Sequence, residues 1–253
     1  MKFKKIKTKM LVSILPVIAV VLIALTLIAA VSCLNMVNTK VQESMTATLD
    51  AETGSINQEL EAVKATATTL SSTVASSYKT LVLSDYEKML TNVITQKDIV
   101  SGSGIWFAPY AYDSNEKYVG PYVYKDGSST VVTYDYSNAE YDYVSQEYYT
   151  IAESSTEPVI TDPYYDPTSD TIMSTCTAPI IADGKFIGCV SVDIILSKIT
   201  DMIDSMVVGE AGSAVLVNED GIYLAGVSED KIQGAVNIAD DTNTSMAAIS
   251  SEV

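Results

Sequence analysis

The chain has 253 residues, with 15 Lys, no Arg, no His and 32 Asp or Glu, which gives a formal net charge of −17. Without Arg it cannot form a bidentate guanidinium clamp on a carboxylate or phosphate, and without His it lacks the usual general base and imidazole metal ligand. The acidic composition excludes nucleic acid as a main partner, because phosphates bind Lys and Arg. We therefore expect neither an enzyme nor a nucleic-acid-binding protein, and we predict no catalytic residue, metal site or cofactor.

The first predicted element is a membrane-spanning helix. Residues 1–9 carry five Lys and no acid, and residues 10–31 are uncharged and almost wholly apolar. At about 1.5 Å per residue this apolar run covers roughly 33 Å, which exceeds a hydrocarbon core of about 30 Å. A retained anchor fits this length better than a cleaved signal peptide, whose apolar region runs about 7–15 residues. The segment before Cys33 also lacks the bulky aliphatic residue of a lipoprotein signal.

The lysine-rich end determines the predicted topology. Because Lys is enriched on the cytoplasmic side of membrane proteins, we expect a cytoplasmic tail (1–9), a transmembrane helix (10–34) and an extracytoplasmic remainder. Apolar residues recur in steps of three and four through residues 36–76, which is typical of a long amphipathic helix. We interpret residues 35–76 as a solvated stalk helix, through which two copies are expected to form a homodimer.

A compact domain is predicted over residues 77–199. Its first element is a helix from Ser84, the expected N-cap, to about Lys97. After Gly102-Ser103-Gly104 the sequence changes to short β-rich runs, and helices followed by an antiparallel meander predict an α+β domain. Turn signals separate these runs at Lys125-Asp126-Gly127, Asp166-Pro167 and Asp183-Gly184.

A second unit is predicted to begin at Val207. An apolar run at residues 214–217 precedes the turn Glu219-Asp220-Gly221, and another apolar run at residues 222–225 follows it. The remaining residues, about thirty, are too few to build an independent core. We therefore expect residues 200–253 to be the start of a second module that is truncated here.

The order of these elements, followed by GEAGSAVLVNEDG at residues 209–221, resembles the double Cache sensor domains of bacterial methyl-accepting chemotaxis proteins. The resemblance covers residues 10–253. It implies a PAS-like membrane-distal module that holds a small extracellular ligand (77–199), part of a membrane-proximal module (200–253), and signalling across the membrane. Histidine kinases and diguanylate cyclases carry the same domain, so these outputs stay open. A membrane-anchored envelope protein without a small-molecule ligand also stays open.

The resemblance also implies a ligand site in the distal module. The amino-acid-binding subgroup holds its ligand with a Tyr, an Arg five positions later, an adjacent Trp-Tyr pair, a Tyr-x-Asp and an Asp on a late strand. The matching positions in this chain are Tyr141, Gln146, Tyr148, Tyr149, Tyr164, Asp166 and Asp193.

Two of these positions depart from the pattern. Gln146 replaces the Arg and Tyr148 replaces the Trp, and Gln donates only neutral hydrogen bonds. The matched positions then provide two carboxylates among aromatic rings and no fixed positive charge, which favours a cation. We expect amines, or polar neutral molecules with N–H donors, to bind better than simple carboxylates, whereas an α-amino acid would leave its carboxylate facing Gln146. Trp106 is expected in the core rather than in the site.

Two further residue groups have simpler interpretations than a functional site. Asp162, Asp166 and Asp170 are clustered, but they lack the alternating ligands and the central Gly of an EF-hand loop, so no calcium site is predicted. Cys176 and Cys189 are interpreted as small buried residues, and a disulfide between them stays open.

Overall fold

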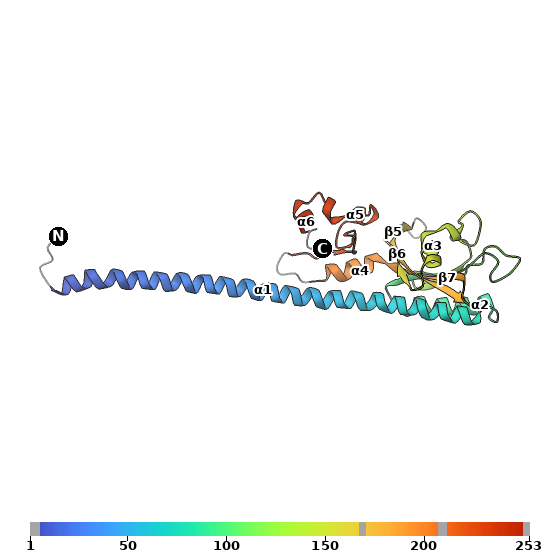
Figure 1. The fold of residues 1–253 in the computed structure, drawn as a ribbon, viewed down its shortest axis with the longest axis horizontal. Coiled ribbons are helices and arrows are strands. Elements are labelled where there is room, and N and C mark those ends of the chain that lie inside the picture. Colours follow the sequence, from blue (N-terminus) through green and yellow to red (C-terminus); the bar gives the residue numbers. More distant parts are fainter. Residues whose placement is uncertain (1–5, 167–170, 207–211, 250–253) are drawn as a thin grey trace. The chain divides into compact units, whose positions relative to one another are not determined.

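The computed structural model describes residues 6–166, 171–206 and 212–249, with side chains from residue 10 onward. The chain divides into two compact units, residues 1–51 and residues 52–253. One helix, α1 (Ile6–Ser77), runs through both units (Figure 1). It contains both the predicted transmembrane helix and the predicted stalk helix. Lys2, Lys4 and Lys5, and the side chains of Lys7 and Lys9, lie outside the described residues.

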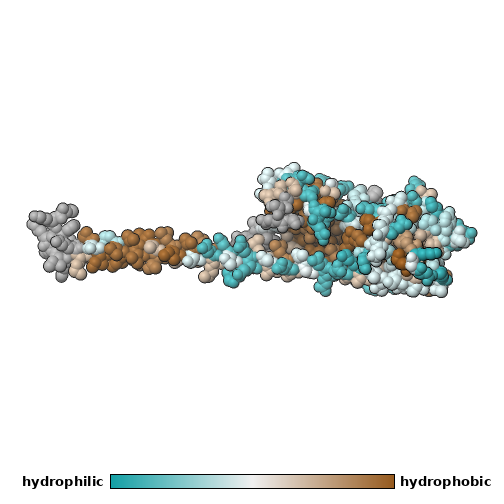
Figure 2. All heavy atoms as spheres, viewed as in Figure 1, coloured by the Kyte–Doolittle hydropathy of each residue, from teal (hydrophilic) through white to brown (hydrophobic). Residues whose placement is uncertain are grey.

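The first unit is the N-terminal part of α1. Its apolar stretch is long enough to cross a membrane and none of it is buried, and Figure 2 shows it as an almost continuous brown surface. Pro16 lies within the helix, and the Thr26 hydroxyl donates to the carbonyl oxygen atoms of Leu22 (3.0 Å) and Ile23 (2.8 Å). These bonds satisfy the hydroxyl group within the helix itself, as an apolar surrounding requires.

In the second unit, the remainder of α1 packs against a β-sheet. Val63, Ala67 and Val74 are fully buried at the spacing that the sequence predicted. We expected a solvated stalk up to residue 76, and this was wrong from about residue 56 onward. That part of the helix belongs to the core of the second unit, because its apolar face is covered by the sheet.

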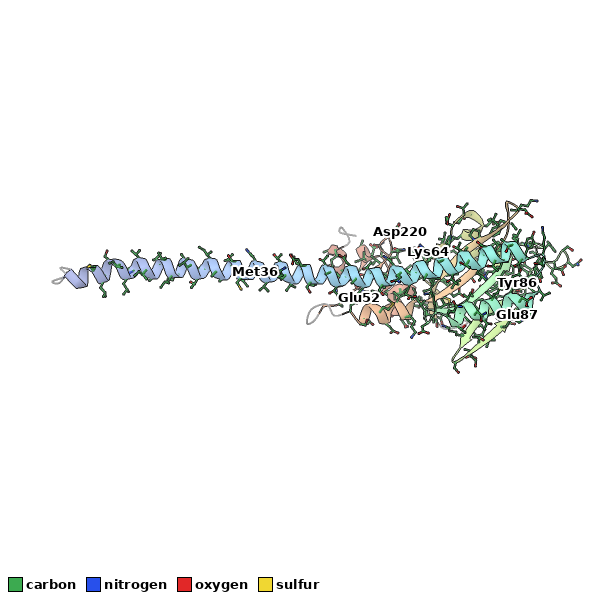
Figure 3. All side chains as sticks on the ribbon, turned by 90° about the horizontal axis from the view of Figure 1, so that it is seen from below. Met36, Glu52, Lys64, Tyr86, Glu87 and Asp220 are labelled. Atoms are coloured by element: carbon green, nitrogen blue, oxygen red, sulfur yellow. The ribbon has the colours of Figure 1, made fainter. Side chains whose placement is uncertain are left out.

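Helix α2 (Leu83–Thr95) lies beside α1 on the same side of the sheet, and Figure 3 labels Tyr86 and Glu87 on it. The fully buried Tyr86 shares a hydrogen bond of 3.1 Å with the Ser77 hydroxyl. The prediction of Ser84 as N-cap was wrong. Val82 occupies that position with no side-chain cap, and Ser84 lies in the first turn.

The sheet has seven antiparallel strands in the order β3-β2-β1-β7-β6-β4, with β5 also paired to β6. Helices and an antiparallel sheet make the fold α+β, as predicted. The expected simple meander was wrong at one place: β1 pairs with β7, which follows it in the chain by about eighty residues. The strands are β1 (Val100–Phe107), β2 (Tyr122–Asp126), β3 (Ser129–Thr133), β4 (Val159–Ile160), β5 (Tyr164–Asp166), β6 (Thr171–Ala182) and β7 (Lys185–Ile195).

Two tight hairpins confirm two of the predicted turns. Gly127, between β2 and β3, has φ +58°, and Asp183 and Gly184, between β6 and β7, have φ +52° and +74°. Positive φ at both central residues of a two-residue loop matches the right-handed twist of the flanking strands. The third predicted turn, at Asp166-Pro167, lies half outside the described residues, because β5 ends at Asp166.

The opposite face of the sheet carries short elements that the sequence did not predict. A 3₁₀ turn (Tyr143–Ser145) leads into α3 (Glu147–Ser154), which packs on β6 and β7. Helix α4 (Leu196–Asp204), which follows β7 directly, instead joins the core cluster that contains α1 and α2, through its buried residues Leu196, Ile199 and Ile203. Helices α1 and α2 on one face and α3 on the other therefore enclose the sheet (Figure 1).

The end of the chain forms a small group of elements. The predicted hairpin is present as β8 (Leu216–Val217) and β9 (Tyr223–Ala225), with Gly221 at φ +80°, whereas residues 207–211 lie outside the described residues. Asp241 accepts hydrogen bonds from the Lys231 ammonium (2.8 Å) and the Tyr223 hydroxyl (2.6 Å), which connect the short elements and, in this order, lower the pKa of Asp241 to about 2. The other elements are α5 (Glu229–Gln233), a 3₁₀ turn (Ile238–Asp240) and α6 (Thr244–Ile249).

Candidate ligand-binding site

Glycines of β1 form the floor of the candidate site, on the face of the sheet that carries α3. A side chain at Gly102 would collide with the Tyr122 hydroxyl, and one at Gly104 would collide with the Trp106 ring. Glycine within a strand often marks the close approach of another group. The sequence placed Gly102-Ser103-Gly104 before the strands, whereas they belong to β1 and allow large aromatic rings to lie flat on the sheet.

An inner cavity of about 50 Å³ lies above this floor. It brings together five of the seven predicted site residues, which come from the segment before α3, from α3, and from strands β5 and β7. These five are Tyr141, Tyr148, Tyr164, Asp166 and Asp193. The other lining residues are Trp106, Tyr122, Tyr136, Met173 and Ser191.

The two remaining predicted residues do not line the cavity. Tyr149 is 1% exposed and packs against Tyr143 and Phe186 in the aromatic cluster beneath α3. The Gln146 side-chain amide donates to the carbonyl oxygen of Tyr141 at 2.9 Å. The residue that the resemblance places against a ligand carboxylate, Gln146, therefore makes a local contact at the start of α3 instead.

Asp193 is the polar centre of the inner cavity. It is 5% exposed, and its carboxylate accepts hydrogen bonds from the hydroxyl groups of Tyr122 (2.6 Å) and Thr175 (2.8 Å). Burial raises the pKa of Asp193 to about 6, and the charge of Asp166 acts in the same direction, whereas the two hydrogen bonds lower it. The carboxylate is therefore mostly ionised at neutral pH, inside a site that penalises its charge.

Tyr148 brings a second polar group, its hydroxyl, to the same cavity. Its hydroxyl group is buried and makes no hydrogen bond of ordinary geometry within the described residues, and the Tyr141 hydroxyl is the polar group that interacts with it. Burial, followed by the nearby Tyr141 hydroxyl, raises the pKa of Tyr148, so the group is neutral. An unpaired buried hydroxyl costs free energy, and its position in the cavity wall makes it available to a ligand.

Trp106 lies in both the core and the site. It is 2% exposed, as expected for the core, and its indole N–H donates to the Ser191 hydroxyl at 3.0 Å. The ring stacks on Tyr122 with a centroid distance of 5.9 Å and is tilted against Tyr148 at 5.6 Å. It also lines the inner cavity, where the sequence had not placed it.

An outer pocket of about 300 Å³ adjoins the inner cavity. Both are bordered by Tyr122, Tyr136, Asp166 and Met173, and the outer pocket adds Asp135 at its exposed rim. Its volume lies at the lower end of the usual range for small-molecule sites, about 300–1,000 Å³. The remaining lining residues are Ser101, Tyr124, Lys125 and Thr133.

Lys125 borders the outer pocket, but its ammonium group is held elsewhere. It donates to the carbonyl oxygen of Lys97 at 2.7 Å, in the loop between α2 and β1. Lys125 follows Val123 by two residues in β2, so the two side chains project to the same face, which is the one packed by α2. Burial lowers the pKa of Lys125. The described residues that line the inner cavity include two Asp and no Lys.

Asp162 and the two buried cysteines lie outside the inner cavity. Asp162 accepts a hydrogen bond from the Asn218 side chain at 3.0 Å, Asp170 lies outside the described residues, and the part of the chain that is described contains no group of three potential metal ligands. Cys176 and Cys189 are both free and buried, as small core residues would be. They lie in separate clusters on opposite faces of the sheet, and burial raises the pKa of both thiols.

The comparisons with known proteins agree with this arrangement. Residues 86–201 match the family model described as methyl-accepting chemotaxis protein-like, first PDC sensor domain. The methyl-accepting chemotaxis protein PctB of Pseudomonas aeruginosa is 28% identical over 119 residues, which are 47% of this chain and 19% of PctB. The matched segment therefore spans about a fifth of that relative.

Solved structures share the fold at low identity. The extracellular domain of a protein described as a histidine kinase, mmHK1S-Z2, is 22% identical with a TM-score of 0.64, and the match covers 78% of this chain and 77% of that one. Methyl-accepting chemotaxis protein X is 21% identical with a TM-score of 0.68, over 85% and 84%. The ligand-binding domain of the Campylobacter jejuni chemoreceptor Tlp3, solved with 4-methylisoleucine, is 13% identical with a TM-score of 0.58, over 81% and 75%.

The family match, the architecture and the placement of the cavity agree on one class of protein. Residues 86–201 form a sensor domain of the PDC, or Cache, type that methyl-accepting chemotaxis proteins carry, as the sequence predicted.

Proposed function

We propose that this chain is the sensor region of a membrane-anchored chemoreceptor that binds a small extracellular molecule through a protonated amine. The observation that carries the proposal is the inner cavity, where the carboxylates of Asp193 and Asp166 lie among tyrosine and tryptophan rings. An ammonium group is attracted both by a carboxylate and by the face of an aromatic ring. It would also compensate the charge of Asp193, which burial makes unfavourable.

An α-amino acid is the second candidate class, because the Tlp3 domain was solved with one. Its ammonium group would suit the same two carboxylates. Its carboxylate would need a donor, and the Gln146 side chain makes a local hydrogen bond outside the cavity. The unpaired Tyr148 hydroxyl offers one neutral hydrogen bond, which is weaker than a charge-assisted pair. We therefore rank simple amines above amino acids, and amino acids above organic acids.

The signalling role is proposed on the basis of α1. We propose that residues 10–34 anchor the chain, that residues 1–9 are cytoplasmic, and that α1 carries a ligand-induced change toward the membrane between two paired copies. The lysine asymmetry supports this topology. In intact cells, a Cys33→Ser chain with Ser129→Cys should react with an impermeant thiol reagent. Protection of that cysteine would reverse the topology.

Three other assignments of the whole protein remain as alternatives to a chemotaxis receptor. The likeness to mmHK1S-Z2 supports the sensor of a histidine kinase, in which the same site would have another output. A diguanylate cyclase output would use the site in the same way. An envelope protein without a small-molecule ligand would leave the cavity without a function, and the absence of any ligand-induced stabilisation would favour it.

The ligand class can be tested by thermal denaturation of the 253-residue chain in nanodiscs. A ligand that binds only the folded state raises the apparent stability. Among compounds of equal carbon number, amines should raise the melting temperature most, α-amino acids less and organic acids least. Stabilisation by an organic acid alone, unchanged by Asp193→Asn, would contradict the proposal.

A further inference from the structure

Three carboxylates line the two adjoining cavities, one after another from the interior to the rim. Asp193 lines the inner cavity, Asp166 lines both, and Asp135 lies on the outer pocket. We propose that the ligand is a linear diamine, with one ammonium group in the inner cavity and the other at Asp135. This inference rests on the proposed function and narrows its ligand class.

The size of the inner cavity favours the end of an unbranched amine. A volume of about 50 Å³ is far below the roughly 300–1,000 Å³ of a usual small-molecule pocket. This space suits an ammonium group and the methylene that bears it. An α-amino acid has a branched carbon next to its ammonium group, and its carboxylate would lie close to Asp193 and Asp166. Like charges at such a distance in a buried site repel strongly.

The walls between the inner and outer carboxylates suit a methylene chain. Tyr122, Tyr136 and Met173 border both cavities, and the Tyr122 and Tyr136 rings meet edge to face with centroids 5.4 Å apart. Aromatic faces and a thioether offer apolar contact to an alkyl chain and cation–π attraction to an ammonium group. A ligand that follows these walls outward from Asp193 reaches the outer pocket.

Asp135 supplies the second anchor at the rim. It is exposed, and its carboxylate makes no hydrogen bond or ion pair within the described residues, although its backbone groups do. The only Lys that borders the outer pocket within the described residues, Lys125, donates to Lys97 instead. A second cation on the ligand would therefore meet an available carboxylate, whereas a distal carboxylate would meet a like charge.

A matched series of ligands tests the inference by calorimetric titration of the 253-residue chain in nanodiscs. The series is 1,4-diaminobutane, 1-aminobutane and 4-aminobutanoate, which differ only in the group at the far end of the same chain. Affinity should fall in this order. Because exposed ion pairs are weak, we expect Asp135→Asn to reduce diamine affinity about threefold to fivefold and to leave 1-aminobutane unchanged. Asp126→Asn, an exposed residue of the neighbouring hairpin outside both pockets, is the control and should have no effect.

The outcomes distinguish a failure of the diamine inference from a failure of the proposed function. Equal binding of 1-aminobutane and the diamine, with no effect of Asp135→Asn, would overturn the diamine inference and leave an amine sensor. Binding of 4-aminobutanoate more tightly than the diamine would also overturn it. Binding of none of the three, together with binding of butanoate, would overturn the proposed function itself.

Discussion

The two faces of the sheet differ in composition although the same strands build both. In β7, Val190, Val192 and Ile194 point toward α1 and α2 and are fully buried in an aliphatic core. The alternate residues Ser191 and Asp193 point to the other face, where they meet tyrosine rings and a cavity. The side-chain period of two in a strand places these sets on opposite faces. One face therefore provides stability and the other provides recognition.

The polar face is costly to the fold in a way that the aliphatic face is not. Burial makes ionisation of the Asp193 carboxylate less favourable. The Tyr148 hydroxyl is buried without a hydrogen bond of ordinary geometry within the described residues. Buried polar groups that are not satisfied reduce stability, and such groups are concentrated at functional sites. A substitution on the first face should therefore change stability, whereas one on the second face should change binding and the pH dependence.

The largest effect is expected on the aliphatic face. Replacing the fully buried Ile194 by Ala should reduce the free energy of unfolding by about 2–5 kcal/mol, because it removes apolar contact and leaves a cavity. Ile181→Ala, at a position that is 46% exposed, is the matched control and should cost less than about 1 kcal/mol. Urea denaturation of both variants measures the difference. Equal losses would contradict the assignment of this face as the stability core.

The next effect is a pH dependence of stability that originates from Asp193. Its folded pKa of about 6 lies above the usual Asp value, so the folded state binds this proton more tightly than the unfolded state does. This tighter proton binding stabilises the folded state by roughly 3 kcal/mol below about pH 4. The stabilisation is lost as the pH rises through about 6. The groups that face this carboxylate are Tyr122, Tyr164 and Asp166, and the tyrosines stay neutral over this range.

Asp193→Asn should lack this contribution. The difference in unfolding free energy between the variant and the original chain, measured at pH 4 and pH 7.5 without ligand, should therefore change in favour of the variant as pH rises. A constant difference would mean that the carboxylate is not buried in the way described. Other carboxylates cancel in this comparison because both chains share them.

The smallest effect is expected at two tyrosines of the aromatic cluster. Tyr143 and Tyr148 are both part of this cluster, but the Tyr143 hydroxyl donates to the carbonyl oxygen of Phe107 at 2.6 Å and accepts from the Val119 N–H at 3.1 Å. Tyr143→Phe should therefore reduce stability by about 1–2 kcal/mol. Tyr148→Phe should leave stability unchanged or raise it slightly, and should weaken amine binding. Thermal denaturation with and without 1-aminobutane distinguishes the two, and a loss of stability at Tyr148 alone would contradict the free hydroxyl.

The sequence predicted the elements better than it predicted the site. Turn chemistry at Asp183-Gly184 and the β-rich runs on either side of it are local signals, so this hairpin was predicted. The pairing of β1 with β7 depends on residues about eighty positions apart, which no local pattern records. For this reason Trp106 and Tyr122 were not assigned to the site, although Gly102 and Gly104 mark the places where their side chains approach β1.

The error at Tyr149 has a local cause. Tyr148 and Tyr149 are consecutive residues of α3, and consecutive helical residues point in directions about 100° apart. Only one of the two could face the cavity, and that residue is Tyr148. Both were assigned to the site because the resemblance matches an adjacent aromatic pair at these positions, and no helix was predicted at residues 147–154. Recognising the helix would have required a choice between them.

The comparison between the two faces is tested most directly by the pH dependence of amine binding. Calorimetric titration of the 253-residue chain in nanodiscs with 1-aminobutane, at pH 5 and pH 7.5, reports whether the cation meets an ionised Asp193. With a pKa of about 6, we expect affinity to rise about tenfold between these pH values, with proton release near pH 6, and we expect Asp193→Asn to abolish the rise. An affinity for 1-aminobutane that does not depend on pH, or that Asp193→Asn leaves intact, would contradict the assignment of this face as a cation site.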